Sequence, residues 1–466
     1  MKKIYSILVI LFVVMSLNAN AQDIYYKYKS PDSEGKQLVV EGTDLLSYYK
    51  DDSTHSGFNA NLHAEYTQWK FNRTWLTGGI AHLEENFSSS KNGSSTTFSR
   101  NQLSLEVFGG ASYYFTPDKF YGTIATFMSY ATESHDTGST ASGSISTNSG
   151  PGYLYGALGY GRVYNAGRIS VAMDFAERLK ESGFLKGTLS QSTILALTNL
   201  VDKQAYGDFS SKYWDEGNPM FFKQVETLLI NDGVISNPLD AANTVRLYET
   251  ISNTYGRYVF YPRYTGYQVQ VQAQYQLFNS TKDKPHDHYA SISGVYGVPV
   301  GPKTGLVFSS YFALPLDTLA SGFGPSNGFA TGGASTFLTF LPDQNNLGFF
   351  NGNYSSFGSR QFNNGTGFFT GAFASGNTTQ IGIRADVYHS ISSKAGIQAF
   401  LQFQDFMPKV GDAATAYEFF GRMDYNLTNY LLSYLYADYS KFNVGGSGTS
   451  PDGRVRFGVG LSARIF

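Results

Sequence analysis

The sequence predicts an all-β membrane protein, an antiparallel transmembrane β-barrel of roughly 16 strands, within about 14–18, with a small α-helical insert. Three observations predict this fold. Apolar and polar residues alternate along many segments, most clearly from Tyr267 to Leu277, and a period of two marks a strand with unlike faces. Short and long connections alternate between these segments, as they do in transmembrane barrels. The chain also ends in an alternating segment, Gly453 to Phe466.

The N-terminus has the features of a secretory signal peptide over residues 1–21. Lys2 and Lys3 are basic, Ile4 to Leu17 is apolar, and residues 19–21 form a small-residue cleavage site. The apolar run is shorter than the ~20 residues that a spanning helix needs, so a membrane anchor is not expected. We therefore expect an exported chain that is cleaved after residue 21.

The composition excludes several classes of protein. The chain has no Cys, which excludes a disulfide-stapled fold and a thiolate metal site. Its 35 Tyr and 37 Phe suit aromatic girdles at two membrane interfaces, and its 50 Gly suit many turns. A formal net charge of -2 gives no case for nucleic-acid binding.

The first part of the barrel is expected over residues 22–168 and contains about six strands. In order, these are Leu38 to Tyr49, Phe58 to Thr67, Trp75 to Glu85, Leu103 to Phe115, Tyr121 to Ala131 and Tyr153 to Tyr164. The connections at 71–73 and 117–118 are expected to be tight turns. Those at 51–57, 88–100 and 135–150 are long and rich in Ser, Thr and Gly, which predicts loops at the opposite end.

Residues 169–252 show a helical period instead, and about four helices are predicted. Ser190 is expected to cap one of them, and Asn218-Pro219 and Asn237-Pro238 are expected to start two others. A bundle of this size has a radius of gyration near ~12 Å. It should therefore lie beneath the barrel mouth, on the periplasmic side, rather than inside the lumen. One missed strand would move it to the cell surface.

Residues 253–466 are expected to form the second part of the barrel, with about ten strands. These are Tyr267 to Leu277, Tyr289 to Pro299, Gly305 to Leu316, Ala330 to Leu341, Leu347 to Phe357, Gln380 to Ser392, Ile397 to Met407, Ala416 to Asn426, Tyr430 to Lys441 and the closing segment. Together the two parts give the even total of roughly 16 that such barrels require.

The closing segment has one apolar face and one polar face that carries Arg454 and Arg456, and it ends on Phe466. With the signal peptide and the loop pattern, it makes the chain resemble bacterial outer-membrane β-barrels of the porin or transporter kind. The resemblance covers the mature chain apart from the insert and identifies no specific family. It implies outer-membrane lipid and the barrel-assembly machinery as partners. The chain departs from the usual terminal signal at Ser462 and Arg464, where apolar residues are expected.

The candidate functional residues are polar side chains whose strand phase turns them toward the lumen. They are Gln268, Gln270, Gln272, Gln274, Arg384, Asp386, Glu418, Arg422, Asp424, Arg454 and Arg456. A water-filled lumen explains them, because barrel strands turn polar residues inward. A hydrogen-bonding or sugar-binding track along the glutamines is the alternative. The mixed signs of the charges argue against strong ion selectivity.

No catalytic, cofactor or metal site is predicted. His286 and His288 flank one Asp in an expected outer loop, and two imidazoles alone do not make a metal site. No Ser and His stand at a spacing that indicates a hydrolase. We therefore do not expect an enzyme.

Two functions from different classes remain open. The first is an outer-membrane channel or transporter for a small solute, in which the periplasmic helical module gates the pore or docks a partner. The second is a structural, assembly or secretion-associated barrel that anchors a helical interaction domain for a periplasmic protein partner. The helical insert favours the second, because a simple diffusion pore does not need it.

Overall fold

The structure is a computed structural model, and it describes residues 23–29, 32–50, 55–92, 96–136, 145–149, 151–205, 214–248, 263–279, 288–316, 339–341, 348–350, 378–392, 394–408, 413–427, 431–444 and 454–464. The expected signal peptide lies outside these residues. No helix within them is long and apolar enough to cross a bilayer.

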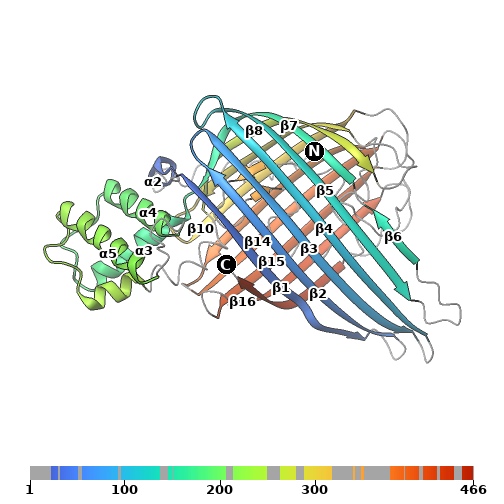
Figure 1. The fold of residues 1–466 in the computed structure, drawn as a ribbon, viewed down its shortest axis with the longest axis horizontal. Helices are drawn as coiled ribbons and strands as arrows, with labels where there is room; N and C mark the ends of the chain where they lie inside the picture. Colours follow the sequence, from blue (N-terminus) through green and yellow to red (C-terminus); the bar gives the residue numbers. More distant parts are fainter. Residues whose placement is uncertain are drawn as a thin grey trace.

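The described chain is mostly antiparallel β-sheet, with helices at one end (Figure 1). Its strands are β1 Ser33–Lys50, β2 His55–Phe71, β3 Trp75–Asn92, β4 Thr96–Tyr114, β5 Phe120–Asp136, β6 Ile145–Ser149, β7 Pro151–Asn165, β8 Tyr264–Asn279, β9 Tyr289–Pro299, β10 Thr304–Pro315, β11 Thr339–Leu341, β12 Gly348–Phe350, β13 Thr378–Ser390, β14 Ala395–Pro408, β15 Ala414–Asn426, β16 Leu431–Val444 and β17 Arg454–Arg464.

These strands are paired into a ring. The main sheet has 15 strands in the order β4-β3-β2-β1-β17-β16-β15-β14-β13-β10-β9-β8-β7-β5-β6. Because β4 also pairs with β5 along its length, the order returns on itself, and β6 continues beside β5 beyond the end of β7. The first and last strands meet along Val39–Thr43 and Gly460–Arg464. Leaving β6 aside, the described residues thus place 14 strands in the ring.

The central figure of roughly 16 strands is therefore too high, and 14 is the lower limit of the expected range of 14–18. The difference lies between β10 and β13. Residues Thr304–Ala313 of β10 pair directly with Gln380–His389 of β13, so both strand edges are satisfied and no further strand fits between them. The described parts of the two segments predicted there, β11 and β12, pair with each other in a separate two-stranded sheet. Alternation identifies a strand face, but it does not identify the neighbouring strand.

One predicted long loop, residues 88–100, is mostly strand. The pairing of β3 with β4 continues from Ser88 opposite Arg100 to Asn92 opposite Thr96. Only residues 93–95 separate the two strands. This stretch is polar on both faces, so it carries no period-two signal. The hydrogen-bonded ladder that starts in the apolar part simply continues into it.

The two faces of the ring differ sharply in exposure and polarity. On β8, Val271 is 61% exposed, whereas the next residue, Gln272, is 3% exposed. The same alternation recurs on other strands, and the exposed face carries large apolar residues, among them Leu103, Leu105, Ile124, Leu158, Ile292, Ile383, Leu401, Phe419, Leu435 and Val459. A soluble sheet buries its apolar face. This ring exposes that face, and we call the opposite, buried face the polar face.

Tyrosines on the polar face lie over glycines of the neighbouring strand. Tyr434 pairs with Gly460 and Tyr436 with Gly458 across β16 and β17. A Cβ added to Gly460 would stand 2.4 Å from the Tyr434 ring, and one added to Gly458 would stand 2.3 Å from the Tyr436 hydroxyl. Glycine is thus required where an aromatic ring covers the strand, and this explains the glycines of the closing segment.

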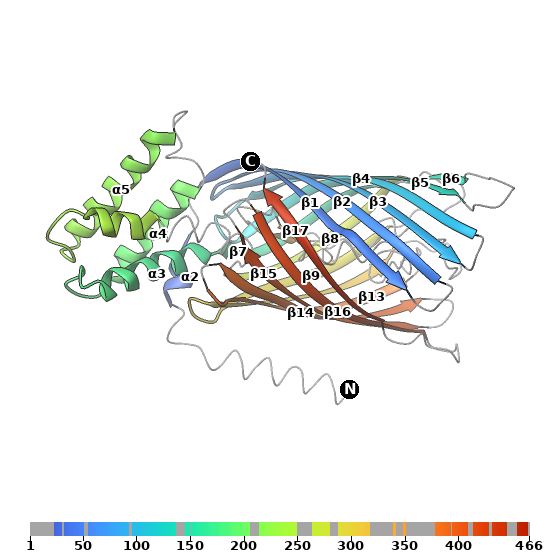
Figure 2. The ribbon, with the colours of Figure 1, turned by 90° about the horizontal axis from the view of Figure 1, so that it is seen from below.

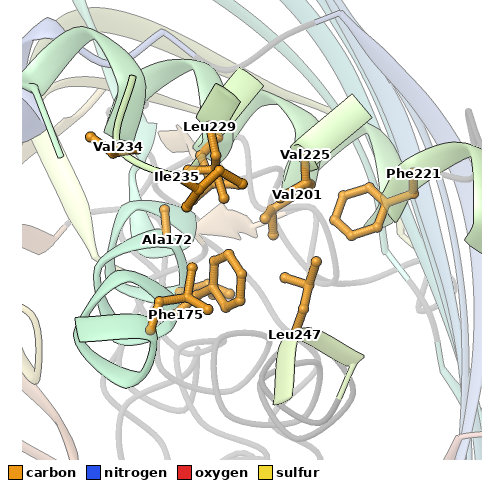
Figure 3. Close-up of a cluster of buried hydrophobic side chains, with 12 residues drawn as sticks. Ala172, Phe175, Val201, Phe221, Val225, Leu229, Val234, Ile235 and Leu247 are labelled. Atoms are coloured by element: carbon orange, nitrogen blue, oxygen red, sulfur yellow. The ribbon is translucent and has the colours of Figure 1, made fainter. Parts of the chain in front are cut away.

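The helical insert lies beyond the end of the ring, outside it (Figure 2). It contains α3 Gly167–Glu181, α4 Gln191–Ala205, α5 Trp214–Asn231 and a further helical stretch at 241–248. A single apolar cluster joins them, including Phe175, Val225 and Leu247 (Figure 3). A short N-terminal helix, α2 Asp23–Lys27, lies beside the insert.

The structure confirms one of the three predicted helix starts and changes the other two. Ser190 caps α4 as expected, because its Oγ accepts a hydrogen bond from Thr193 N at 3.1 Å. However, α5 begins at Trp214, and Pro219 lies inside it. The last helical stretch is capped by Asp240, whose Oδ1 accepts from Asn243 N at 2.7 Å. A carboxylate one turn further on replaces the expected asparagine at 237.

We predict that Gly460→Ala destabilises the barrel by about 1–3 kcal/mol, because the added methyl group overpacks the Tyr434 ring. The measurement is the urea midpoint of the refolded protein in detergent, followed by tryptophan fluorescence. Gly421→Ala is the matched control, since nothing lies within 4 Å of a Cβ at that strand position. Equal midpoints for the two variants would contradict the ring-over-glycine explanation.

Candidate functional site

The polar face of β8 carries a chain of hydrogen-bonded amides. The Tyr121 hydroxyl accepts from Gln268 Nε2 at 2.6 Å and donates to Gln270 Oε1 at 3.0 Å. Gln270 Nε2 then donates to Gln272 Oε1 at 3.2 Å. The tyrosine comes from β5, and it reaches β8 across the backbone of β7, where Gly159 leaves room for its ring. The three amides thus form one connected track with Tyr121.

Two Arg–Asp pairs lie on the polar face, each on one strand at a spacing of two residues. Arg384 Nη2 lies 2.7 Å from Asp386 Oδ1 on β13, and Arg422 Nε lies 2.6 Å from Asp424 Oδ1 on β15. All four side chains are buried. A spacing of two keeps both partners on the same strand face. Each pair is neutral as a unit, which makes its burial tolerable.

Aromatic rings support both guanidinium groups. The Arg384 guanidinium lies 3.7 Å from the Phe400 ring centroid, and that of Arg422 lies 3.7 Å from the Tyr434 centroid. The Phe400 and Phe420 rings stack with centroids 5.1 Å apart. Planar guanidinium groups stack well on aromatic faces. The result is a rigid layer of rings and paired charges along β13 to β16.

Several buried polar atoms on this face have no hydrogen-bond partner within the described part of the chain. They include Gln268 Oε1, Ser293 Oγ and Gln404 Oε1. Gln404 is otherwise fixed, because its Nε2 donates to the Tyr311 hydroxyl at 2.7 Å. A buried acceptor without a partner costs about 1–3 kcal/mol. Water or a polar ligand would satisfy these atoms.

The predicted site residues fall into two groups, according to whether the structure describes their side chains. Gln268, Gln270, Gln272, Arg384, Asp386, Arg422 and Asp424 are buried on the polar face. The side chains of Gln274, Glu418, Arg454 and Arg456 lie outside what the structure describes.

Sequence reasoning missed the aromatic and amide partners on the polar face. These are Tyr121, Tyr311, Gln398, Phe400, Gln402, Gln404, Phe420, Tyr434 and Tyr436, all buried except the half-buried Tyr311. The signal was available, because Gln398, Phe400 and Gln402 share one parity within their strand. The high Tyr and Phe content alone indicates only aromatic girdles, because aromatic residues occur on both faces.

A second polar cluster forms the neck through which the chain enters and leaves the helical insert. Asn165 Oδ1 accepts from Gly167 N at 3.0 Å and from Arg263 N at 3.1 Å. Ala166 N also donates to Arg263 O at 2.8 Å. One amide side chain therefore joins the start of α3 to the residue just before β8.

Two buried arginines extend this neck to the short turns at the same end of the ring. Arg162 donates to the carbonyl oxygens of Asn72 at 2.9 Å and Arg73 at 3.2 Å, and it lies 3.6 Å from Asp118. Arg263 donates to the Lys303 carbonyl and, at 2.9 Å, to Ser390 Oγ. Since these acceptors belong to four different hairpin ends, the arginines hold the end of the ring as one unit.

The N-terminal helix α2 closes the gap between the ring and the insert. The Tyr25 hydroxyl lies 3.3 Å from Ser170 Oγ on α3, and Lys29 Nζ lies 3.5 Å from the Asp118 carboxylate. Burial raises the pKa of Tyr25, so its hydroxyl stays protonated at neutral pH. The insert is thus attached by its neck and by α2.

Metal binding finds no support in the described residues, where no group of three His, Asp or Glu could hold an ion. Of the two histidines weighed above, His286 lies outside the described residues. His288 stacks on the Tyr275 ring, with centroids 4.2 Å apart.

The fold and this site together define the class of protein: a β-barrel with an apolar outer face, a filled polar face and a helical module at one end. No family model and no curated protein matches the sequence. Among solved structures, it is similar to CdiB from Escherichia coli, at 7% identity over 94% of this chain and 63% of that one, with a TM-score of 0.35.

Two further solved structures show similar likeness. The β domain of the Bordetella autotransporter BrkA has 7% identity over 93% of this chain and all of its own, with a TM-score of 0.28. OmpT, an outer membrane protein of Vibrio cholerae, has 9% identity over 93% of this chain and 97% of its own, with a TM-score of 0.28. Likeness at this level assigns no function to this chain.

We predict that Asp386→Ala destabilises the barrel by about 3–5 kcal/mol, because it leaves the Arg384 guanidinium buried without its carboxylate. Removing both partners in Arg384→Met/Asp386→Ala should recover part of that loss. The measurement is again the urea midpoint in detergent. A double variant no more stable than Asp386→Ala would contradict a neutral, self-contained pair.

Proposed function

We propose that this protein spans the bacterial outer membrane as a β-barrel and carries a small polar solute through its interior. The exposed apolar face would contact lipid, and the polar face would line the interior. This proposal is non-enzymatic. The observation that carries it is the alternation of exposed Val271 with buried Gln272 around the ring, because only a membrane or a partner favours an apolar exterior.

The spacing of exposed aromatic residues supports a membrane-spanning band. Phe120 and Tyr130 are both exposed on β5 and lie ten positions apart. At about 3.3 Å per residue and a tilt near ~40°, they stand roughly 25 Å apart along the membrane normal. This matches the ~25 Å apolar band of outer-membrane barrels. The expected signal peptide supports the same location.

The filled polar face supports a narrow passage rather than a wide pore. Small barrels of about 8 strands fill their interior with side chains, whereas those of about 16–18 leave an aqueous channel. A ring of 14 strands falls between these sizes, and its described glutamines and arginines on the polar face are buried. The paired charges of Arg384 and Arg422 favour an uncharged or zwitterionic solute. Unpartnered acceptors such as Gln268 Oε1 supply hydrogen-bonding positions for it.

The helical module favours a second role beside transport. It stands beyond the end of the ring (Figure 2) and is attached by the Asn165–Arg263 neck. A module outside the lumen controls entry or binds another protein more readily than it plugs the barrel. A secretion-associated or assembly barrel that presents this module to a periplasmic partner is therefore the alternative function.

We predict that the purified protein conducts ions in planar bilayers in small, voltage-independent steps. Because Ala166 N donates to Arg263 O at 2.8 Å, residues 167–262 can be replaced by a tight Asn-Gly turn. Unchanged conductance in this variant would assign the module to partner binding, and larger conductance would make it a gate. No conductance in either form would refute the transport proposal and leave the alternative.

A further inference from the structure

The helical module consists of two structurally equivalent halves, residues 167–198 and 217–248, in which each position of the second half is numbered 50 higher. In both, a helix ends at a glycine with positive φ: Gly183 at 70° and Gly233 at 71°. Phe184 N donates to Leu179 O, and Val234 N donates to Leu229 O, 50 positions later. Both helix ends are therefore Schellman motifs of the same geometry.

The equivalence extends to the capping residues and the core. Ser190 caps the second helix of the first half, and Asp240 caps that of the second half. Buried residues also coincide: Val171 with Phe221, Phe175 with Val225, Leu179 with Leu229, Thr193 with Asn243 and Leu197 with Leu247. The halves pack against each other, since Lys186 N donates to Val234 O at 2.9 Å.

One face breaks the equivalence. In the first half, Ser170 is 1% exposed and Thr198 is 0% exposed; their counterparts Met220 and Tyr248 are 56% and 43% exposed. Other pairs in which the second member is exposed and the first is not are Ile169 with Pro219, Met173 with Lys223, Asp174 with Gln224, and Leu195 with Val245. All these positions lie on one side of the two helices.

The cover on the first half is α2. Its residues Ile24 and Tyr25, and Tyr28 just after it, pack against Ile169, with Met173, Ile194 and Leu195 alongside. The Tyr25 hydroxyl contacts both Ser170 Oγ and Met173 Sδ, at 3.3 and 3.8 Å, and Lys27 Nζ donates to Gln191 Oε1 at 3.1 Å. The first half is thus a docking site that holds a short aromatic helix.

We propose that the second half is the same kind of docking site, and that it binds a short aromatic helix from a partner protein. Its face consists of Met220, Lys223, Val245 and Tyr248. The chain's own α2 is held elsewhere by the first half and by Asp118. The partner helix presents apolar residues at the spacing of Ile24, Tyr25 and Tyr28. It also carries a carboxylate, because Lys223 replaces the Met173 that receives the Tyr25 hydroxyl.

This assignment concerns the module alone and does not rest on transport by the barrel. It is tested on the full-length protein in detergent. The chain has no Cys, so Ala241→Cys accepts a single fluorophore at the rim, at the counterpart of Gln191. The probes are two synthetic peptides: residues 23–29 of this chain, and the same peptide with Tyr25→Glu.

The expected result is a crossover of specificity. The unaltered site should bind the Tyr25→Glu peptide roughly threefold more tightly than the native peptide, through a partly exposed ion pair with Lys223. Met220→Ser/Lys223→Met, which copies the first half, should reverse this preference. Met220→Asp should weaken both peptides by about tenfold, because it removes an apolar contact.

Ser236→Asp is the matched control, because Ser236 is exposed in the connection that follows α5 and is not part of the face formed by Met220, Lys223, Val245 and Tyr248. This variant should bind like the unaltered protein. The proposal is overturned if no saturable fluorescence change occurs, if Met220→Asp binds as well as Ser236→Asp, or if the preference does not reverse. Conductance measurements do not bear on these outcomes, so this proposal and the transport proposal fail separately.

Discussion

The neck of the helical module is centred on one buried side chain, Asn165. Its Oδ1 accepts hydrogen bonds from Gly167 and Arg263, the two points where the chain leaves and rejoins the ring. Arg263 continues the network to Lys303 and Ser390, and so connects the neck to the turns of β9–β10 and the end of β13. Charged and polar groups at this depth are stable only when they are paired in this way. The neck therefore fixes the module to the ring end through buried hydrogen bonds.

On the polar face, buried arginines are neutralised by carboxylates, whereas the arginine that continues the neck network donates to a carbonyl and a hydroxyl oxygen. Each arginine is neutralised by an aspartate two residues away on its own strand, so neither pair needs a second strand to form. The rings of Phe400 and Tyr434 fill the space beneath. The track of Gln268, Gln270 and Tyr121 is joined by neutral hydrogen bonds, each of which contributes about 0.5–1.5 kcal/mol. If a solute passes, it displaces amide and tyrosine side chains at lower cost than the ion-paired layer.

The sequence could predict the strands and their faces, because period two follows directly from strand geometry. It could not predict that β10 pairs with β13, because alternation identifies the two faces of a strand but not the strands that lie at its edges. It missed the rings of Tyr434 and Tyr436 on the polar face, because these rings are accommodated by Gly460 and Gly458, which belong to another strand. The duplication in the module was also missed. Its halves share burial and capping roles while their residue identities differ, as at Ser190 and Asp240.

The duplication makes the two ends of the module different: one half has a covered face and the other has an exposed one. Two equivalent halves related in this way present two equivalent faces, and the structure covers one with α2 while it leaves Met220 and Val245 of the other exposed. The covered face belongs to the half that adjoins the neck, and α5 of the open half is drawn on the side away from the ring (Figure 1). An arrangement that only stabilised the barrel end would gain nothing from an exposed apolar second face, since such a face costs solubility. One half thus acts as the anchor, and the other half leaves its equivalent face exposed.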